Sequence, residues 1–116
     1  KLHPGLEVQG TDIIIEKPRF GAFTNTDLDL ILKIREISTV IITGIATNIC
    51  CETTAREAYG LNYQVLFVSD ATCTFDMEGC KEKTLHAATC ASLAFGFAEV
   101  LDYKKLVCKI QANNTP

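Results

Sequence analysis

The chain has 116 residues, of which 47% are hydrophobic, and a formal net charge of -3. This length suits one domain with a buried core and is too short for two domains of ordinary size. The acidic balance and the lack of a basic run argue against binding to nucleic acid or to an anionic membrane. With no apolar run of 18 residues and no signal-peptide pattern, we expect a soluble, cytoplasmic protein.

Six cysteines invite comparison with a disulfide framework or a metal site. They show no Cys-x-x-Cys spacing, and the two histidines, His3 and His86, are far apart in the chain. Spacing of this kind is not typical of zinc sites or of small disulfide-rich domains. We therefore predict free thiols in a reducing compartment, no metal ligands and no cofactor.

Short apolar runs predict the strands of this domain. They lie at residues 12–16, 39–44 and 64–70, and a shorter one follows at 98–101. The first three are almost continuously apolar, which is typical of strands covered on both faces in a parallel sheet. We expect these three to be neighbouring central strands.

Helical patterns separate the strands. One helix is predicted over 26–37, a second over 48–60 with Asn48 as its N-cap, and a third over 78–97. A last helix should start at Asp102. This alternation indicates βαβ units, and ligands bind such sheets beyond the carboxyl ends of the strands.

The carboxyl ends of the predicted strands bring Cys50 and Lys17 to one edge of the sheet. Cys50 falls in the first turn of its helix, where unpaired N–H groups and the helix dipole favour a thiolate. Cys51 shares a face with Ala55 and Ala58, so we expect it to pack on the sheet. Two plainer interpretations stay open: Cys50 as a small core residue, and Lys17 as a strand-end lysine with its head in solvent.

Two segments carry a resemblance to a known family. They are "EKPRFGAFTNTDLD" and "VIITGIATNICCETTAREAYGLNYQVLFVSDATCT". Over about residues 10–101 the chain resembles the isochorismatase-like cysteine hydrolases. It is most similar to their amidohydrolases, those acting on ureidoacrylate, N-carbamoylsarcosine and biuret. The resemblance implies a three-layer α-β-α sandwich around a parallel, Rossmann-like sheet.

The resemblance also implies roles for individual residues. Cys50 matches the family's nucleophile and Lys17 its catalytic lysine. The family has a cis peptide before the residue that matches Ala46. The N–H groups of Ala46 and Cys50 would then form an oxyanion hole.

Further residues are implied with less specific roles. Asn48 and Thr47 would hold the nucleophile loop, although both residue types also form ordinary turns. Phe23 and Arg19 would line the substrate pocket, and a solvated arginine is the alternative for Arg19. Asp70 is expected to be structural, with its carboxylate bonded to nearby backbone.

The chain departs from the family at the third catalytic residue, an aspartate at the end of the first strand. Asp12 lies at the start of its predicted strand, at the wrong end of the sheet. We therefore expect residues 1–116 to be a single domain, a C-terminal portion of a longer chain that lacks the first strand and helix. Its exposed apolar surface would be covered by a homo-oligomer or by an N-terminal fragment. Several family members bind a metal through residues of the region that holds this first strand and helix.

The hypothesis from sequence is an enzyme that hydrolyses a small amide, ureido or carbamoyl compound through a thioester. The alternative is a non-catalytic module of the same fold that acts by binding or assembly, and the unmatched aspartate favours it. True isochorismatase activity on a vinyl ether is less consistent with the sequence, because those relatives lack the nucleophilic cysteine.

Overall fold

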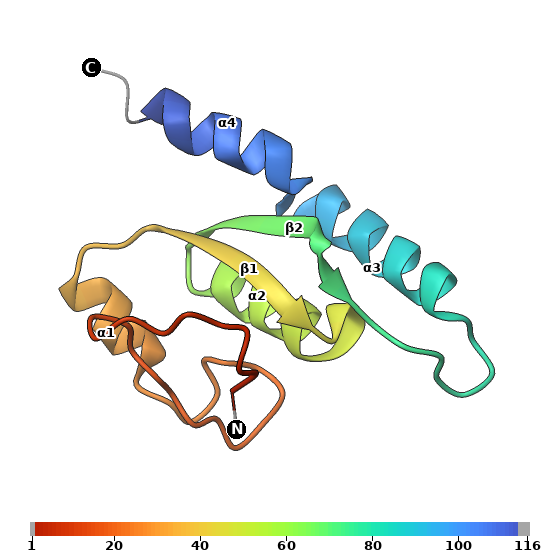
Figure 1. The fold of residues 1–116 in the computed structure, drawn as a ribbon, viewed down its shortest axis with the longest axis horizontal. Helices are drawn as coiled ribbons and strands as arrows, with labels where there is room; N and C mark the ends of the chain where they lie inside the picture. Colours follow the sequence, from red (N-terminus) through yellow and green to blue (C-terminus); the bar gives the residue numbers. More distant parts are fainter. Residues whose placement is uncertain (1, 114–116) are drawn as a thin grey trace.

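The described part of the chain, residues 2–113 of a computed structural model, is built around a parallel sheet. Its strands are β1 (Thr39–Ile45), β2 (Gln64–Cys73) and β3 (Glu99–Leu101), in the order β1-β2-β3. Both strand pairs are parallel. Figure 1 shows this sheet between the helices. The α/β class, the parallel pairing of the second and third predicted strands and the short last strand are confirmed.

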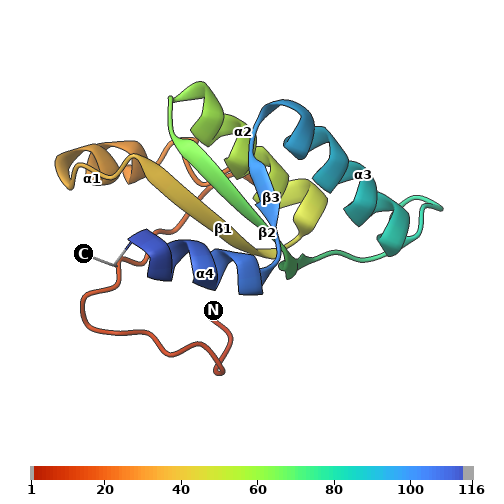
Figure 2. The same ribbon diagram turned by 90° about the horizontal axis from the view of Figure 1, so that it is seen from above.

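Helices cover both faces of the sheet. Figure 2 shows two of them behind the strands and the last one in front. The α-helices are α1 (Leu28–Ile34), α2 (Glu52–Gly60), α3 (Glu82–Gly96) and α4 (Tyr103–Asn113). A single π-helical turn, η1 (Thr47–Cys51), leads into α2. The three layers follow from strands that are apolar on both faces, since each face needs a helix to exclude water.

The core lies between β2 and the pair α2 and α3. Phe67 and Leu93 are completely buried, and Ala55 and Ala58 turn the same face of α2 onto the strands. Small residues on this face allow the helix to approach the sheet closely. The predicted packing of this face is confirmed.

The prediction of a strand over residues 12–16 is wrong. This segment pairs with no strand of the described chain, and Ile13 and Ile14 are 44% and 65% exposed. An apolar run becomes a strand only where a neighbour can bond its backbone.

Three helix boundaries also differ from prediction. The first helix ends at Ile34 rather than residue 37, because Glu36 adopts a left-handed φ of 57° and Ile37 N–H closes the helix onto Leu32 O. The third begins at Glu82 after a turn in which Gly79 has a φ of 80°. Asn48 is no N-cap, because it lies inside η1 and Ala46 precedes the helical turn.

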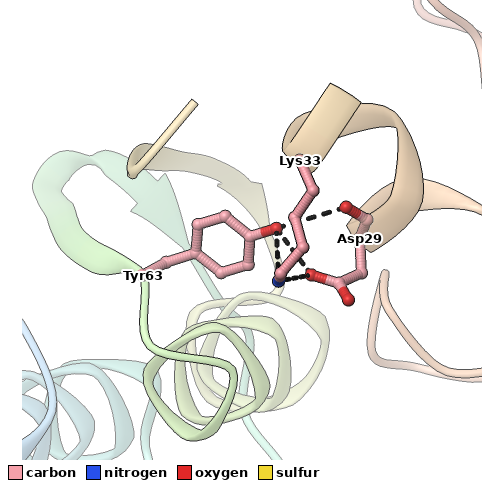
Figure 3. A network of polar contacts seen from close by, with 3 residues as sticks. All are labelled: Asp29, Lys33 and Tyr63. Carbon is pink, nitrogen blue, oxygen red and sulfur yellow. Dashed lines mark hydrogen bonds and ion pairs between the residues drawn. The ribbon is translucent and has the colours of Figure 1, made fainter. Parts of the chain in front are cut away.

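A cluster of polar side chains, drawn in Figure 3, connects the residues that precede the sheet to the sheet. The hydroxyl of Tyr63 donates to Asp29 Oδ1 at 2.6 Å, and Lys33 Nζ lies 2.6 Å from the same oxygen. Hydrogen bonds from Lys33 and Tyr63 hold the pKa of Asp29 below its ordinary value. The cluster joins α1 to the residue just before β2, at the amino end of the sheet.

Two aspartates fix the start of α4. Tyr103 N–H donates to Asp70 Oδ1 and Lys105 N–H to Asp102 Oδ1, each at 2.8 Å. Asp70 lies where the pairing of β2 with β1 is interrupted, between Phe67 and Thr72. Asp70 therefore has the structural role expected from sequence, and Asp102 is the predicted cap.

Candidate active site

Lys17 and Cys50, which are 33 positions apart, meet at the carboxyl end of β1. The Lys17 ammonium lies 3.4 Å from Cys50 Sγ and also donates to the carbonyls of Phe20 and Arg19, at 3.0 and 3.2 Å. Three acceptors around one ammonium fix its position on the sulfur. Cys50 is half-buried.

The loop that carries Lys17 is held by α2 rather than by the sheet. Ala22 N–H donates to Thr54 Oγ1 at 3.0 Å, and Phe23 N–H donates to Glu57 Oε1 at 3.1 Å. Thr24 bonds the other oxygen of the same carboxylate. A Cβ on Gly21 would collide with this carboxylate. Glu57, which sequence reasoning missed, therefore keeps the lysine over the cysteine.

The backbone turns sharply between β1 and the residues around Cys50. Gly44 has a φ of 120°, a conformation that favours glycine, and the Ile45–Ala46 peptide is cis. The carbonyl of Ala46 then accepts from the N–H groups of Ile49 and Cys51, both at 3.1 Å. The resemblance implied a cis bond at this place, and the structure has it.

A cavity of about 300 Å³ opens beside this pair. Five consecutive residues, 41–45, line it along the free edge of β1, together with Lys17 and Cys50. Consecutive strand residues point to opposite faces, so a cavity that touches all five lies along the strand's edge. Its other lining residues are Ala22, Cys51 and Thr54. A volume of this size accommodates a small molecule or a segment of chain.

Cys51 is buried, whereas its neighbour Cys50 is half-buried. It is 4% exposed and its Sγ points to Thr43 O at 3.9 Å. Burial, with smaller contributions from Cys50 and Cys73, raises the pKa of Cys51 to about 11. It therefore holds its proton where an ordinary cysteine, with a pKa of 9.0, would lose it. The predicted packing of Cys51 on the sheet is confirmed.

This raised pKa predicts a pH dependence of stability. Below pH 9 both folded and unfolded states keep the Cys51 proton, and between pH 9 and 11 only the folded state keeps it. The contribution to stability is present at low pH and lost as pH rises through that window. The free energy of unfolding, measured by urea titration of wild type and Cys51→Ala from pH 8 to 11, should show an extra decline of about 1–2 kcal/mol in wild type, allowing for partial solvent screening. Parallel curves would contradict it.

The other predicted site residues lie around this centre without lining the cavity. Arg19 is exposed and bonds the Pro18 carbonyl through Nη1 at 2.9 Å. Phe23 stacks on Tyr63 with ring centroids 5.6 Å apart. Asn48 accepts from Thr74 Oγ1 at 2.6 Å and approaches Met77 Sδ at 3.4 Å. Their assignment to substrate binding stays a prediction.

Within residues 2–113, all six cysteines are free, as expected from their spacing. No cluster of three or more His, Cys, Asp or Glu side chains in that range could hold a metal ion. No helix in the described part of the chain has the length and apolarity needed to cross a membrane.

The fold and the lysine–cysteine pair together define an α/β domain with a candidate cysteine nucleophile at the carboxyl edge of its sheet. The sequence pattern of the isochorismatase domain matches residues 1–104. The chain belongs to the isochorismatase family. The resemblance seen in the sequence is therefore confirmed.

Individual relatives agree with this assignment. Over 100 residues the chain is 45% identical to Nicotinamidase 3 of Arabidopsis thaliana, covering 86% of this chain and 48% of that protein. Over 61 residues it is 48% identical to Ureidoacrylate amidohydrolase RutB of Methylorubrum extorquens, covering 53% of this chain and 25% of that protein. A solved cysteine hydrolase from Pseudomonas syringae pv. phaseolicola superposes with a TM-score of 0.93 at 30% identity, covering 97% of this chain and 55% of that one. The chain thus spans less than half the length of these two curated relatives.

Proposed function

We propose that the protein is a cysteine-dependent hydrolase of a small amide, ureido or carbamoyl compound. The observation that carries this proposal is the 3.4 Å contact between Lys17 Nζ and Cys50 Sγ beside a cavity. A cation on the sulfur favours the thiolate, which is the reactive form of cysteine. The names of two relatives, a nicotinamidase and a ureidoacrylate amidohydrolase, support a substrate with a carbon–nitrogen bond.

The proposed reaction has two halves. The Cys50 thiolate attacks the substrate carbonyl, and the N–H groups of Ala46 and Cys50 stabilise the oxyanion. The C–N bond breaks, the amine leaves with a proton, and a thioester forms on Cys50. Water then attacks the thioester and releases the carboxylic or carbamic acid, with the thiol restored.

Proton transfer requires a further group. The aspartate that the resemblance assigns to this role has no match among the 116 residues, so activity is proposed for the whole protein that carries this chain. General acid–base help of this kind contributes about 10²–10⁴-fold to rate. Lys17 stabilises negative charge on the sulfur and the intermediate.

The test is a substrate panel with that whole protein. Nicotinamide, ureidoacrylate, N-carbamoylsarcosine and biuret are incubated with the enzyme, and released ammonia is measured. Mass spectrometry of the quenched reaction looks for an acyl group on the Cys50 peptide. Turnover of one compound together with acyl-Cys50 supports the proposal. Absence of both across the panel favours the alternative, a non-catalytic binding or assembly module.

We also propose that the free edge of β1 is covered by chain from outside these residues or by a second copy. Ile41 and Ile45 on this strand are 46% and 67% exposed, which is unusual for a strand in an α/β sheet. The 116 residues expressed alone should therefore self-associate or bind a hydrophobic dye, as measured by light scattering and dye fluorescence. A monodisperse monomer that binds no dye would contradict this prediction.

A further inference from the structure

The turn that carries Cys50 is held by side chains from two distant parts of the chain. Thr47, the first residue of η1, is completely buried, and its Oγ1 lies 2.9 Å from His86 Nδ1. The next residue, Asn48, bonds Thr74 beyond the end of β2. Two consecutive residues of a one-turn helix are thus fixed by contacts outside it.

His86 is itself fixed in orientation. It belongs to α3, and its other ring nitrogen, Nε2, lies 3.6 Å from Cys90 Sγ one turn further along. Both ring nitrogens therefore have a partner. A ring held at two points defines where Thr47 can lie, because the imidazole is the side-chain partner of this buried hydroxyl.

A displacement of the Thr47 backbone would also move Cys50. η1 is five residues long, and the Ala46 carbonyl just before it accepts from both Ile49 and Cys51. A turn this short cannot absorb a shift at its first residue without moving the fourth. Misplacing a reacting atom by about 1 Å can cost about 10²-fold in rate.

We propose that His86 is a positioning residue for Cys50, acting through the Thr47 hydroxyl from α3. The inference rests on the proposed function, in which Cys50 is the nucleophile. His86 touches neither Cys50 nor the cavity beside Lys17, so its role is to set the place of the sulfur and not to exchange protons with substrate.

A pair of substitutions separates this role from a contribution to helix stability. Asparagine carries its polar atoms on Cγ, where the imidazole carries Nδ1, so His86→Asn keeps a partner for Thr47. Glutamine moves them one atom outward, so His86→Gln loses that partner. Glutamine is the better helix former, so a role in stabilising α3 alone predicts the opposite order of effects.

Two rates are measured in the whole protein: alkylation of Cys50 by iodoacetamide at pH 7, read by peptide mapping, and kcat on a substrate from the panel. We expect His86→Asn to stay within about threefold of wild type. His86→Gln should lower both rates by about tenfold or more, with KM changed less than about twofold. His3→Gln, at the exposed histidine, is the matched control and should change neither rate.

Substitutions at Thr47 test the same proposal independently if the His86 variants fold poorly. Thr47→Val removes the hydroxyl at nearly constant shape and should act like His86→Gln, whereas Thr47→Ser should behave like wild type. The double variant Thr47→Val with His86→Gln should be no slower than either single variant, since both remove the same contact.

The alkylation rate keeps this inference separate from the substrate proposal. If no compound is hydrolysed but Cys50 labelling follows the predicted order, the positioning role stands and the proposed chemistry fails. If His86→Asn and His86→Gln label equally, or if Thr47→Val labels like Thr47→Ser, the positioning role is overturned whatever the activity.

Discussion

Replacing Cys50 by serine should abolish hydrolysis by the whole protein. A serine hydroxyl beside Lys17 is not ionised at neutral pH, so the attacking group is lost while the shape of the side chain is kept. Loss of a nucleophile that acts together with its partners typically lowers kcat by more than about 10³-fold. The acyl-enzyme signal on the peptide containing residue 50 should disappear as well.

The control for this experiment is another cysteine of the same chain. Cys108 is an exposed, free thiol on α4, so Cys108→Ser should leave kcat and the thermal midpoint unchanged. Cys50→Ser should also keep the midpoint of wild type within a few degrees, because the residue is only half-buried. Activity of Cys50→Ser close to wild type would rule out Cys50 as the nucleophile.

Cys51→Ser should show the reverse pattern. This thiol is buried against the sheet, so a hydroxyl there loses solvation and lowers stability by about 1–3 kcal/mol. Iodoacetamide at pH 7 should label Cys50 well before Cys51, whose raised pKa keeps it in the unreactive thiol form. Faster labelling of Cys51 than of Cys50 would contradict the roles proposed here for the two cysteines.

The helix and strand pattern could be predicted from the sequence because each apolar run that forms a strand has a partner strand within the chain. Residues 39–45, 64–73 and 99–101 pair with one another, so their local preference and their environment agree. Residues 12–16 have the same apolar pattern but pair with no strand in the described structure. Periodicity records what a segment can bury, and it does not tell whether a partner strand is at hand.

The approach of Lys17 to Cys50 was predicted for a partly wrong reason. The lysine was expected at the end of a strand, where the sheet itself would aim it. In the structure its loop is fastened to α2 by Glu57 and Thr54. A glutamate within a helical run gives no sign in the sequence that its carboxylate will accept the backbone N–H of Phe23, 34 residues upstream.

His86 shows the same limit. Its distance in sequence from His3 and from the cysteines argued against a metal site, but it gave no sign of a contact with Thr47. That contact depends on how α3 packs on the turn after β1, which only the folded chain determines. Side-chain partners across 39 residues are set by packing and not by local pattern.

Replacing Lys17 by methionine should slow both catalysis and alkylation of Cys50. Methionine keeps the length of the side chain but removes the ammonium that lies 3.4 Å from the sulfur. The thiolate then loses its nearest positive charge, and the oxyanion intermediate loses electrostatic support. Removal of one such group typically costs about 10²–10³-fold in kcat. Alkylation at pH 7 should fall less, because it involves the thiolate alone.

Lys17 also bonds two carbonyls of its own loop, so a purely structural role has to be separated from an electrostatic one. Lys17→Arg keeps a permanent charge and several donors, although its planar head meets the sulfur in a different geometry. If charge matters most, Lys17→Arg should alkylate faster than Lys17→Met at equal thermal midpoints. If loop anchoring is the whole role, the midpoint should fall in Lys17→Met and alkylation should not slow. Lys104→Met, at an exposed lysine of α4, is the control for both the alkylation rate and the thermal midpoint.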